Sequence, residues 1–139
     1  MKKIIVFTTS DRPREYTSDI KNNLEQDLDA EVQIIDLDSL DFYVVNNEVQ
    51  IRYQGSTLSD VSLCYIKHWH AHEEAALVVS SYFKMASTKV LPQETLRIVP
   101  KTKFGETFLL AMNGLPVPDS VYNFSNLKFL ENYNSVVET

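Results

Sequence analysis

Glycine is scarce in this chain of 139 residues, which contains only Gly55, Gly105 and Gly114. A dinucleotide-binding fingerprint and a Walker loop both need clustered glycines at a strand-to-helix turn, where the backbone approaches phosphate groups. The three glycines lie far apart, so neither motif can be assembled from them. A self-contained nucleotide-binding domain of either type is therefore disfavoured.

Cysteine is scarcer still, since Cys64 is the only one. A single thiol excludes an internal disulfide and is typical of a reducing compartment. Cys64 lies in the middle of an apolar stretch, which favours a packed thiol, because a nucleophilic cysteine needs an accessible, electropositive setting. A G-x-S-x-G elbow is also missing, so Ser10, Asp11 and the histidines do not form a hydrolase triad. We assign no catalytic residue.

Long apolar runs and basic clusters are missing too. No run approaches the roughly 20 residues that cross a bilayer, and the apolar stretch of "MKKIIVFTTSDRPRE" is too short for a signal peptide. The net charge is -6 and the basic residues are scattered, whereas nucleic-acid-binding surfaces concentrate them. We therefore expect a cytoplasmic α/β protein without a membrane or nucleic-acid partner.

Alternating strand and helix patterns fill most of the chain. "KKIIVFT" is typical of a buried strand, Tyr16, Ile20, Leu24 and Leu28 form a helical stripe, and "EVQIIDLD" is typical of a second strand. "DFYVVNNEVQIRYQG" predicts a hairpin that turns at two asparagines. "DVSLCYIKHW" then predicts a strand, "HEEAALVVSSYFKMA" a helix and "TLRIVP" a further strand.

The last part of the chain predicts a helix over about 102–113, with Gly114 as its left-handed cap and prolines beyond it. "DSVYNF" predicts a strand, and a final helix is expected from Ser125. The order of elements predicts an α/β fold with three layers and one mostly parallel sheet, into which the hairpin is inserted.

The sequence "KHWHAH" places His68, His70 and His72 at alternate positions. An extended backbone would put all three on one side and a helix would align the first with the last, so either could offer imidazoles to zinc or copper. No acidic or thiol partner stands at ligand spacing, however. We prefer the alternative, polar residues at a strand tip, and assign no metal site.

Basic side chains follow two of the predicted strands. In open parallel α/β sheets, ligands bind outside the carboxyl ends of the strands. Arg12 follows the first strand, and Lys67, His68 and His70 follow a later one. We therefore predict that these four residues bind an anionic substrate group, such as a carboxylate or phosphate. The alternative for each of them is a solvated loop residue.

Two stretches carry motifs in a recognisable order. "NNEVQIRYQGSTLSDVSLCYIKHWH" contains a hairpin with a Y-x-G end and a basic strand tip at Lys67, and "KTKFGETFLLAMNGLPVPDSVY" contains a Leu-Leu helix and a Gly-Leu-Pro-Val-Pro exit. In these features the chain resembles the N-terminal part of ATP-grasp ligases, above all the RimK-like and glutathione-synthetase-like enzymes. Lys67 stands where arginine is usual, and Thr102 stands where aspartate is usual.

The resemblance implies a pre-ATP-grasp, Rossmann-like domain over 1–100. Residues 101–139 would then be a connecting helix, a proline-containing exit and the start of the ATP-grasp region. Such ligases use ATP and Mg²⁺ to activate a carboxylate as an acyl phosphate, and an amine or other nucleophile then attacks the acyl carbon and displaces phosphate. The resemblance thus implies a substrate-binding domain, inactive alone and without a cofactor of its own, whose parent enzyme continues beyond Thr139 and modifies an amino-acid or peptide acceptor. It also implies that Lys103 approaches the ATP phosphates.

Two other functions compete with this one. A stand-alone α/β module could bind a peptide or protein by adding a strand to the hairpin edge around Val49 to Tyr53. A response-regulator-like or flavodoxin-like domain is disfavoured, because the chain has no acidic phosphoacceptor pocket and no flavin phosphate loop. An uncovered inter-domain face would also favour a homodimer.

Overall fold

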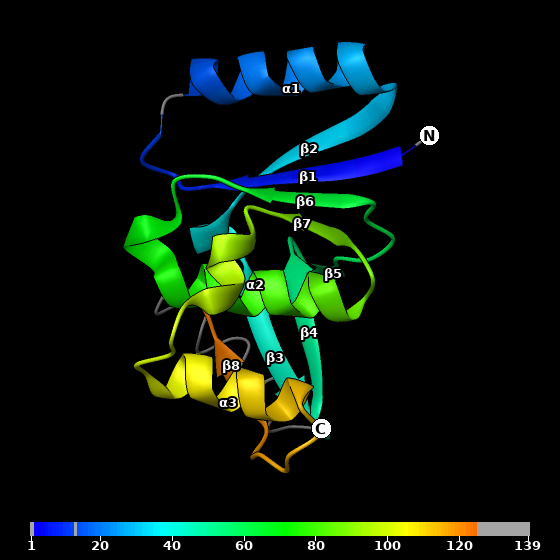
Figure 1. The fold of residues 1–139 in the computed structure, drawn as a ribbon. Coiled ribbons are helices and arrows are strands. Elements are labelled where there is room, and N and C mark those ends of the chain that lie inside the picture. The colour runs from blue at the N-terminus through cyan, green and yellow to red at the C-terminus, as the bar shows by residue number, and fades with distance from the viewer. Residues whose placement is uncertain (1, 13, 125–139) are drawn as a thin grey trace.

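The structure, a computed structural model, describes residues 2–12 and 14–124. It is a mixed α/β fold with one parallel and one antiparallel sheet, each of four strands (Figure 1). The strands of the parallel sheet are β1 (Lys2–Thr8), β2 (Ala30–Asp36), β6 (Leu63–Ile66) and β7 (Lys89–Leu91). The α-helices are α1 (Arg14–Leu28), α2 (Glu73–Met85) and α3 (Lys103–Met112).

The parallel sheet has the order β2-β1-β6-β7 and is covered on both faces. Alternate residues of a strand point to opposite faces. Ile4 and Val6 of β1 belong to the smaller core, against which α1 packs Ile20 and Leu24. The intervening residues of β1 belong to the larger core with α2, where the rings of Phe7 and Phe83 lie 6.0 Å apart. The continuous apolar run of β1 follows from this burial on both sides.

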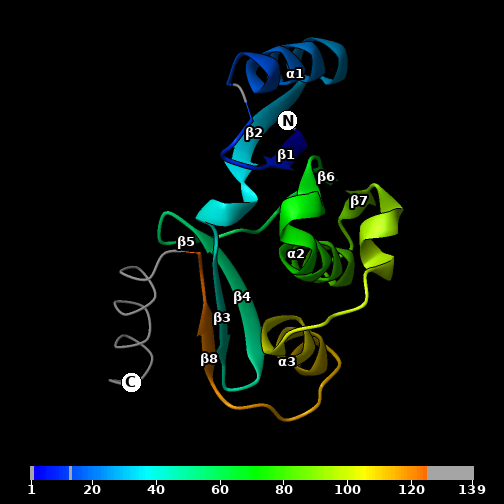
Figure 2. The ribbon, with the colours of Figure 1, turned by 90° about the vertical axis from the view of Figure 1, so that its left-hand side faces the viewer.

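The antiparallel sheet has the order β5-β4-β3-β8 and extends away from the parallel one, with α3 along one face (Figure 2). Its strands are β3 (Asp41–Val45), β4 (Glu48–Tyr53), β5 (Ser56–Thr57) and β8 (Ser120–Tyr122). The predicted hairpin is confirmed, since β3 and β4 pair and Asn46 and Asn47 have φ of 51° and 65°. Phe42 of β3 packs edge-on against Phe104 and Phe108 of α3 in the larger core.

The expected α/β fold with a parallel sheet is confirmed, but the hairpin does not belong to that sheet. The hairpin instead pairs with β8, so it starts a second, antiparallel sheet. The predicted strand "TLRIVP" is also wrong, because Gln93–Arg97 form the 3₁₀ helix η3 and the strand lies earlier, at Lys89–Leu91. Thr95 explains the difference, since its buried hydroxyl donates to the carbonyl of Pro92 at 2.9 Å. Such a local bond stabilises a turn at the expense of a strand.

The connecting helix and its exit match their predictions. Helix α3 ends at Met112, Gly114 has a φ of 77°, and β8 follows. The final helix expected from Ser125 lies outside the described residues. Among the residues that the structure describes, no helix is both long enough and apolar enough to span a membrane.

Candidate functional site

The strand order of the parallel sheet reverses between β1 and β6, because the chain passes from β1 to β2 on one side and from β6 to β7 on the other. Ligands of open α/β sheets bind outside the carboxyl ends at such a reversal. Lys67 N donates to Phe7 O at 2.8 Å, so the segment after β6 starts beside the end of β1. Arg12, Lys67 and His68, three of the four predicted substrate-binding residues, lie together here and form what we call the strand-end site.

The acidic side chains around the strand-end site are already engaged. Asp11 follows β1, Asp36 ends β2, and Asp38 belongs to the 3₁₀ helix η1 (Leu37–Ser39). Asp11 accepts a hydrogen bond from the Thr9 hydroxyl, and Asp36 forms an ion pair with Arg14 Nη2 at 2.7 Å. Asp38 accepts hydrogen bonds from the amide of Ser10 at 3.2 Å and from its hydroxyl. The Thr9 bond also lowers the pKa of Asp11. Arg12, by contrast, has no ion pair within residues 2–12 and 14–124.

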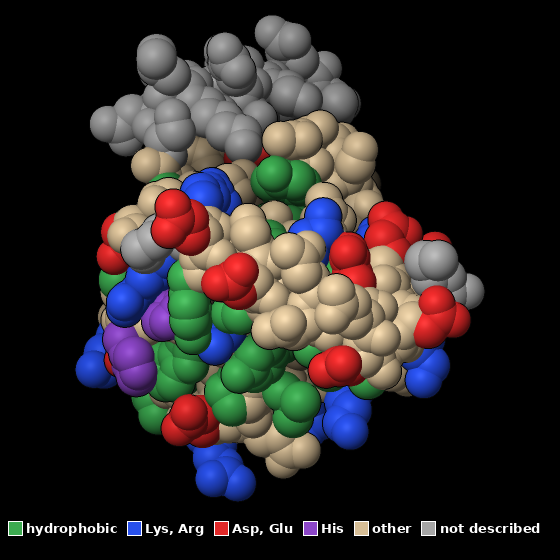
Figure 3. All heavy atoms as spheres, turned by 90° about the horizontal axis from the view of Figure 1, so that it is seen from above, with side chains coloured by type: hydrophobic (Ala, Val, Ile, Leu, Met, Phe, Trp, Pro, Cys, Tyr) green, Lys and Arg blue, Asp and Glu red, His purple; other side chains and the backbone are tan. Residues whose placement is uncertain are grey.

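Lys67 is held by aromatic residues rather than by a carboxylate. Its Nζ donates to the hydroxyl of Tyr16 at 3.0 Å and lies 5.1 Å and 5.5 Å from the ring centres of Tyr16 and Tyr65. Figure 3 looks down on the α1 side of the molecule, where histidine side chains lie at one margin beside hydrophobic and basic ones. The ammonium group is thus positioned, and its charge remains available to an anion.

His68 has an unusual backbone and a lowered pKa. Its φ of 53° and ψ of 40° are left-handed, which is uncommon for a residue other than glycine and is frequent at functional sites. Burial lowers the pKa of His68, and the charges of Arg12 and Lys67 lower it further. Its Nδ1 lies 3.3 Å from the hydroxyl of Thr8. When that hydroxyl donates, Nε2 carries the imidazole proton and can donate it to a ligand.

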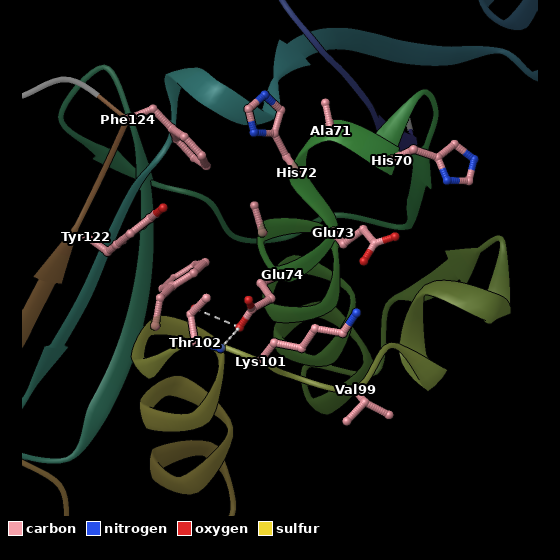
Figure 4. A pocket seen from close by; sticks show the side chains of 12 residues that line it. His70, Ala71, His72, Glu73, Glu74, Val99, Lys101, Thr102, Tyr122 and Phe124 are labelled. Atoms are coloured by element: carbon pink, nitrogen blue, oxygen red, sulfur yellow. Dashed lines mark hydrogen bonds between the residues drawn. The ribbon is translucent and has the colours of Figure 1, made fainter.

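The three histidines diverge instead of sharing a site. His70 and His72 belong to the 3₁₀ helix η2 (Trp69–His72), which follows His68. The ring of His70 lies 4.2 Å from that of Trp69, and the ring of His72 lies 4.7 Å from that of Phe124. Figure 4 shows His70 and His72 pointing in different directions. Within the described part of the chain, no group of three or more His, Cys, Asp or Glu residues is arranged to hold a metal ion.

Lys103 lies in the first turn of α3, apart from the strand ends. Its side chain is 96% exposed, and its Nζ is 3.9 Å from Glu106 Oε2. It borders a groove between α3 and β8. The structure therefore places the residue that the resemblance assigns to ATP on an open helix surface.

A second hollow, the interhelical pocket, was missed by the sequence analysis. It has a volume of about 270 Å³ and lies between the N-termini of α2 and α3 and the end of β8 (Figure 4). Glu74 of α2 accepts hydrogen bonds from Thr102 N at 3.1 Å and Thr102 Oγ1 at 2.9 Å, so it caps α3 from outside that helix. Tyr122 stacks on Phe104, with ring centres 3.9 Å apart and planes 10° apart. His70 lines this pocket rather than the strand-end site.

The sequence contained one signal for the interhelical pocket. Thr102 precedes a helical stripe, and threonine is a common N-cap residue. Its hydroxyl binds Glu74 rather than an amide of its own helix, which local sequence cannot reveal. A scan against models of protein families and a search of curated proteins found no match to this chain, so its geometry carries the functional argument.

Proposed function

We propose that this chain is the N-terminal, substrate-binding domain of an ATP-dependent carboxylate–amine ligase of the ATP-grasp superfamily, or of a relative that modifies a peptide side chain. The observation that carries the proposal is the strand-end site. Arg12 and Lys67 supply two cations that form no ion pair among the described residues, and His68 places an imidazole beside them. Such a set suits a carboxylate on an amino acid or peptide.

The order of elements supports the proposal. The hairpin β3–β4, the helix α3, the proline-containing exit and β8 follow one another as the resemblance to RimK-like and glutathione-synthetase-like enzymes implies. In the proposal, α1, the parallel sheet and α2 are the three layers of a Rossmann-like pre-ATP-grasp domain. The antiparallel sheet then extends this domain on the side of α3.

The proposal assigns no ATP or Mg²⁺ site to the described residues. Lys103 points into solvent beside Glu106, and Gly105, the glycine nearest to it, is packed against Glu74 and Pro100. The proposal therefore assigns nucleotide and metal to other parts of a parent enzyme. In this chain, Arg12 and Lys67 bind the anionic group of the substrate, and the hydrogen bond with Thr8 orients His68 toward it.

A binding experiment tests the strand-end site. The probes are N-acetylalanine, which carries a carboxylate, and N-acetylalaninamide, which does not. In ¹⁵N NMR titrations, we expect saturable shifts of amides in 9–12 and 67–68 with the acid alone. Arg12→Gln should weaken this binding about fivefold, since an exposed ion pair contributes up to about 1 kcal/mol. Lys84→Gln, an exposed lysine of α2, is the control. Equal binding of the amide, or no effect of Arg12→Gln, would refute the proposal.

A second measurement concerns the nucleotide. Calorimetry with magnesium-ATP should show no saturable binding to this chain, and stoichiometric binding would contradict the proposal. The natural reading frame supplies a further check. A ligase predicts that it continues past Thr139 into a lysine-bearing ATP-grasp region, whereas a stop codon there favours a stand-alone module.

One observation favours that second candidate, a peptide-binding module. On its outer edge, β4 pairs with β5 only at Arg52 and Tyr53, and among the described residues no strand covers Glu48 to Gln50. An apolar groove of about 400 Å³ lies beside this open edge. An added peptide strand could pair there and place a side chain in the groove. Slowed exchange of the amides in 48–50 on peptide addition would support this candidate.

A further inference from the structure

The interhelical pocket has an acidic side and an aromatic side (Figure 4). Glu73 and Glu74 come from the first turn of α2, while Tyr122 and Phe124 come from β8 and the segment after it. Lys101 is the only lysine or arginine among the described residues that line the pocket. Carboxylates thus outnumber fixed cations around it.

The N-terminus of α3 at this pocket is not free to bind an anion. A helix N-terminus attracts negative charge, but Glu74 already occupies the N-terminus of α3 through both of its bonds to Thr102. Both bonds use Oε1 of Glu74. Among the described residues, neither Oε2 of Glu74 nor the carboxylate of Glu73 accepts a hydrogen bond. An anion would have to displace Glu74 and lie beside Glu73, whereas a cationic donor finds acceptors.

The aromatic side also suits a cation. Tyr122 is fixed by stacking on Phe104, and Phe124 meets Tyr122 edge-on, with ring centres 5.4 Å apart. Both side chains are directed toward the hollow in Figure 4. Ring faces attract ammonium groups within about 6 Å. The volume of about 270 Å³ is small for a ligand pocket, so it suits a molecule of the size of an amino acid.

We propose that the interhelical pocket binds the ammonium group of an amino-acid-sized amine. Oε2 of Glu74 accepts its hydrogen bond, Glu73 adds negative charge at the rim of the pocket, and Tyr122 and Phe124 form the aromatic wall. Helix η2 begins directly after His68 of the strand-end site and ends at His72, which lines this pocket, so the two sites adjoin. The lining of the pocket alone supports the binding of an amine. The identification of this amine as the acceptor of the ligase rests on the proposed function.

The probes for this site are 2-phenylethylamine, which is a cation near neutral pH, and its neutral N-acetyl derivative. In ¹⁵N NMR titrations of the full chain, we expect saturable shifts of amides in 73–75 and at Thr102 and Tyr122 with the amine only. Equal binding of the acetylated compound would overturn the inference, because an apolar ligand would then suffice.

Matched variants test the two sides of the pocket. Glu73→Gln removes a charge from an exposed side chain and should weaken amine binding about three- to fivefold. Glu94→Gln, an exposed glutamate of η3 outside the pocket, should leave it unchanged. Tyr122→Phe should bind like the wild type, and Tyr122→Leu should bind more weakly, because only the second loses the ring. Wild-type affinity of Glu73→Gln would overturn the inference.

The two proposals fail separately. If the amine produces no shifts while N-acetylalanine still shifts the amides of Arg12 and Lys67, the ammonium pocket is refuted and the strand-end site stands. If only the amine binds, the pocket stands as an amine site and the proposed function is refuted.

Discussion

Gly105→Ala tests the contact between α2 and α3 most directly. Gly105 lies in the first half of α3 and is buried. A methyl group there would overlap the Oε1 atom of Glu74 and would lie 2.8 Å from Cβ of Pro100 and 3.1 Å from Cδ of Glu74. Real side chains essentially never approach so closely, so both neighbours would have to move.

Three effects set the magnitude. Alanine in place of glycine stabilises a helix by about 1 kcal/mol. Displacing Glu74 removes its two bonds to Thr102, a loss comparable to that of an N-cap, about 1–2 kcal/mol. Moving Pro100, whose ring cannot rotate away, costs about 1–3 kcal/mol, as in other overpacked sites. The expected net effect is therefore a destabilisation of about 1–4 kcal/mol.

Urea unfolding measures this effect, with circular dichroism and the fluorescence of the single tryptophan, Trp69, as probes. A double-mutant cycle isolates the cause. In a Glu74→Ala background, Gly105→Ala should cost about 1–2 kcal/mol less than in the wild type, because one of the two clashes is gone. A stabilised Gly105→Ala protein, or effects that add within about 0.5 kcal/mol, would show that Glu74 does not pack against α3 as described.

Three further predictions concern buried groups. Burial raises the pKa of the Cys64 thiol, so iodoacetamide at pH 8 should label the protein in urea but not when folded, and rapid labelling of folded protein would contradict the buried position. Burial lowers the pKa of His68, so the imidazole binds a proton less tightly in the folded protein than in the unfolded one. Protonation of His68 therefore lowers the free energy of unfolding as the pH falls through 6.5. An NMR titration should place its midpoint below 6.5, and Arg12→Gln should raise it by removing a positive neighbour; a midpoint at or above 6.5 would argue against the strand-end site. Thr95→Val should cost about 1–3 kcal/mol in urea unfolding, because the buried hydroxyl of Ser80 loses a partner at 2.6 Å, and an unchanged midpoint would mean that this bond contributes nothing.

Local patterns predicted the elements whose causes are local. The β1 strand is apolar on both faces because α1 and α2 cover it. The stripe of α1 packs through Ile20 and Leu24, whereas its end members Tyr16 and Leu28 are exposed. Asn46 and Asn47 adopt the positive φ that a tight hairpin needs, and Gly114 adopts the one that ends α3. In each case the residue type and its conformation are linked within a few positions of the chain.

The errors arose where distant residues decide. The pairing of β8 with β3 joins Tyr122 to Phe42, and neither strand alone indicates its neighbour. Because of this pairing, the hairpin that was expected to be inserted into the parallel sheet belongs to a second, antiparallel sheet. Thr95 is β-branched and favours a strand, but its hydroxyl lies 2.6 Å from that of Ser80 in α2, 15 residues away, and this distant contact joins the local bond to Pro92 in stabilising a 3₁₀ turn. Propensity is a weak guide when a buried hydroxyl has better partners elsewhere.

The same distinction separates the two candidate sites. The strand-end site was predictable because the carboxyl ends of parallel strands share one edge, whatever the remaining packing. The interhelical pocket was not, because Glu74 and Thr102 are 28 residues apart and meet only when α3 docks on α2. The 3₁₀ helix η2 runs between the two sites. It starts after His68, whose backbone is left-handed, and ends at His72. The left-handed backbone of His68 therefore sets the direction in which η2 starts, and η2 carries the chain from the strand-end site to one wall of the pocket.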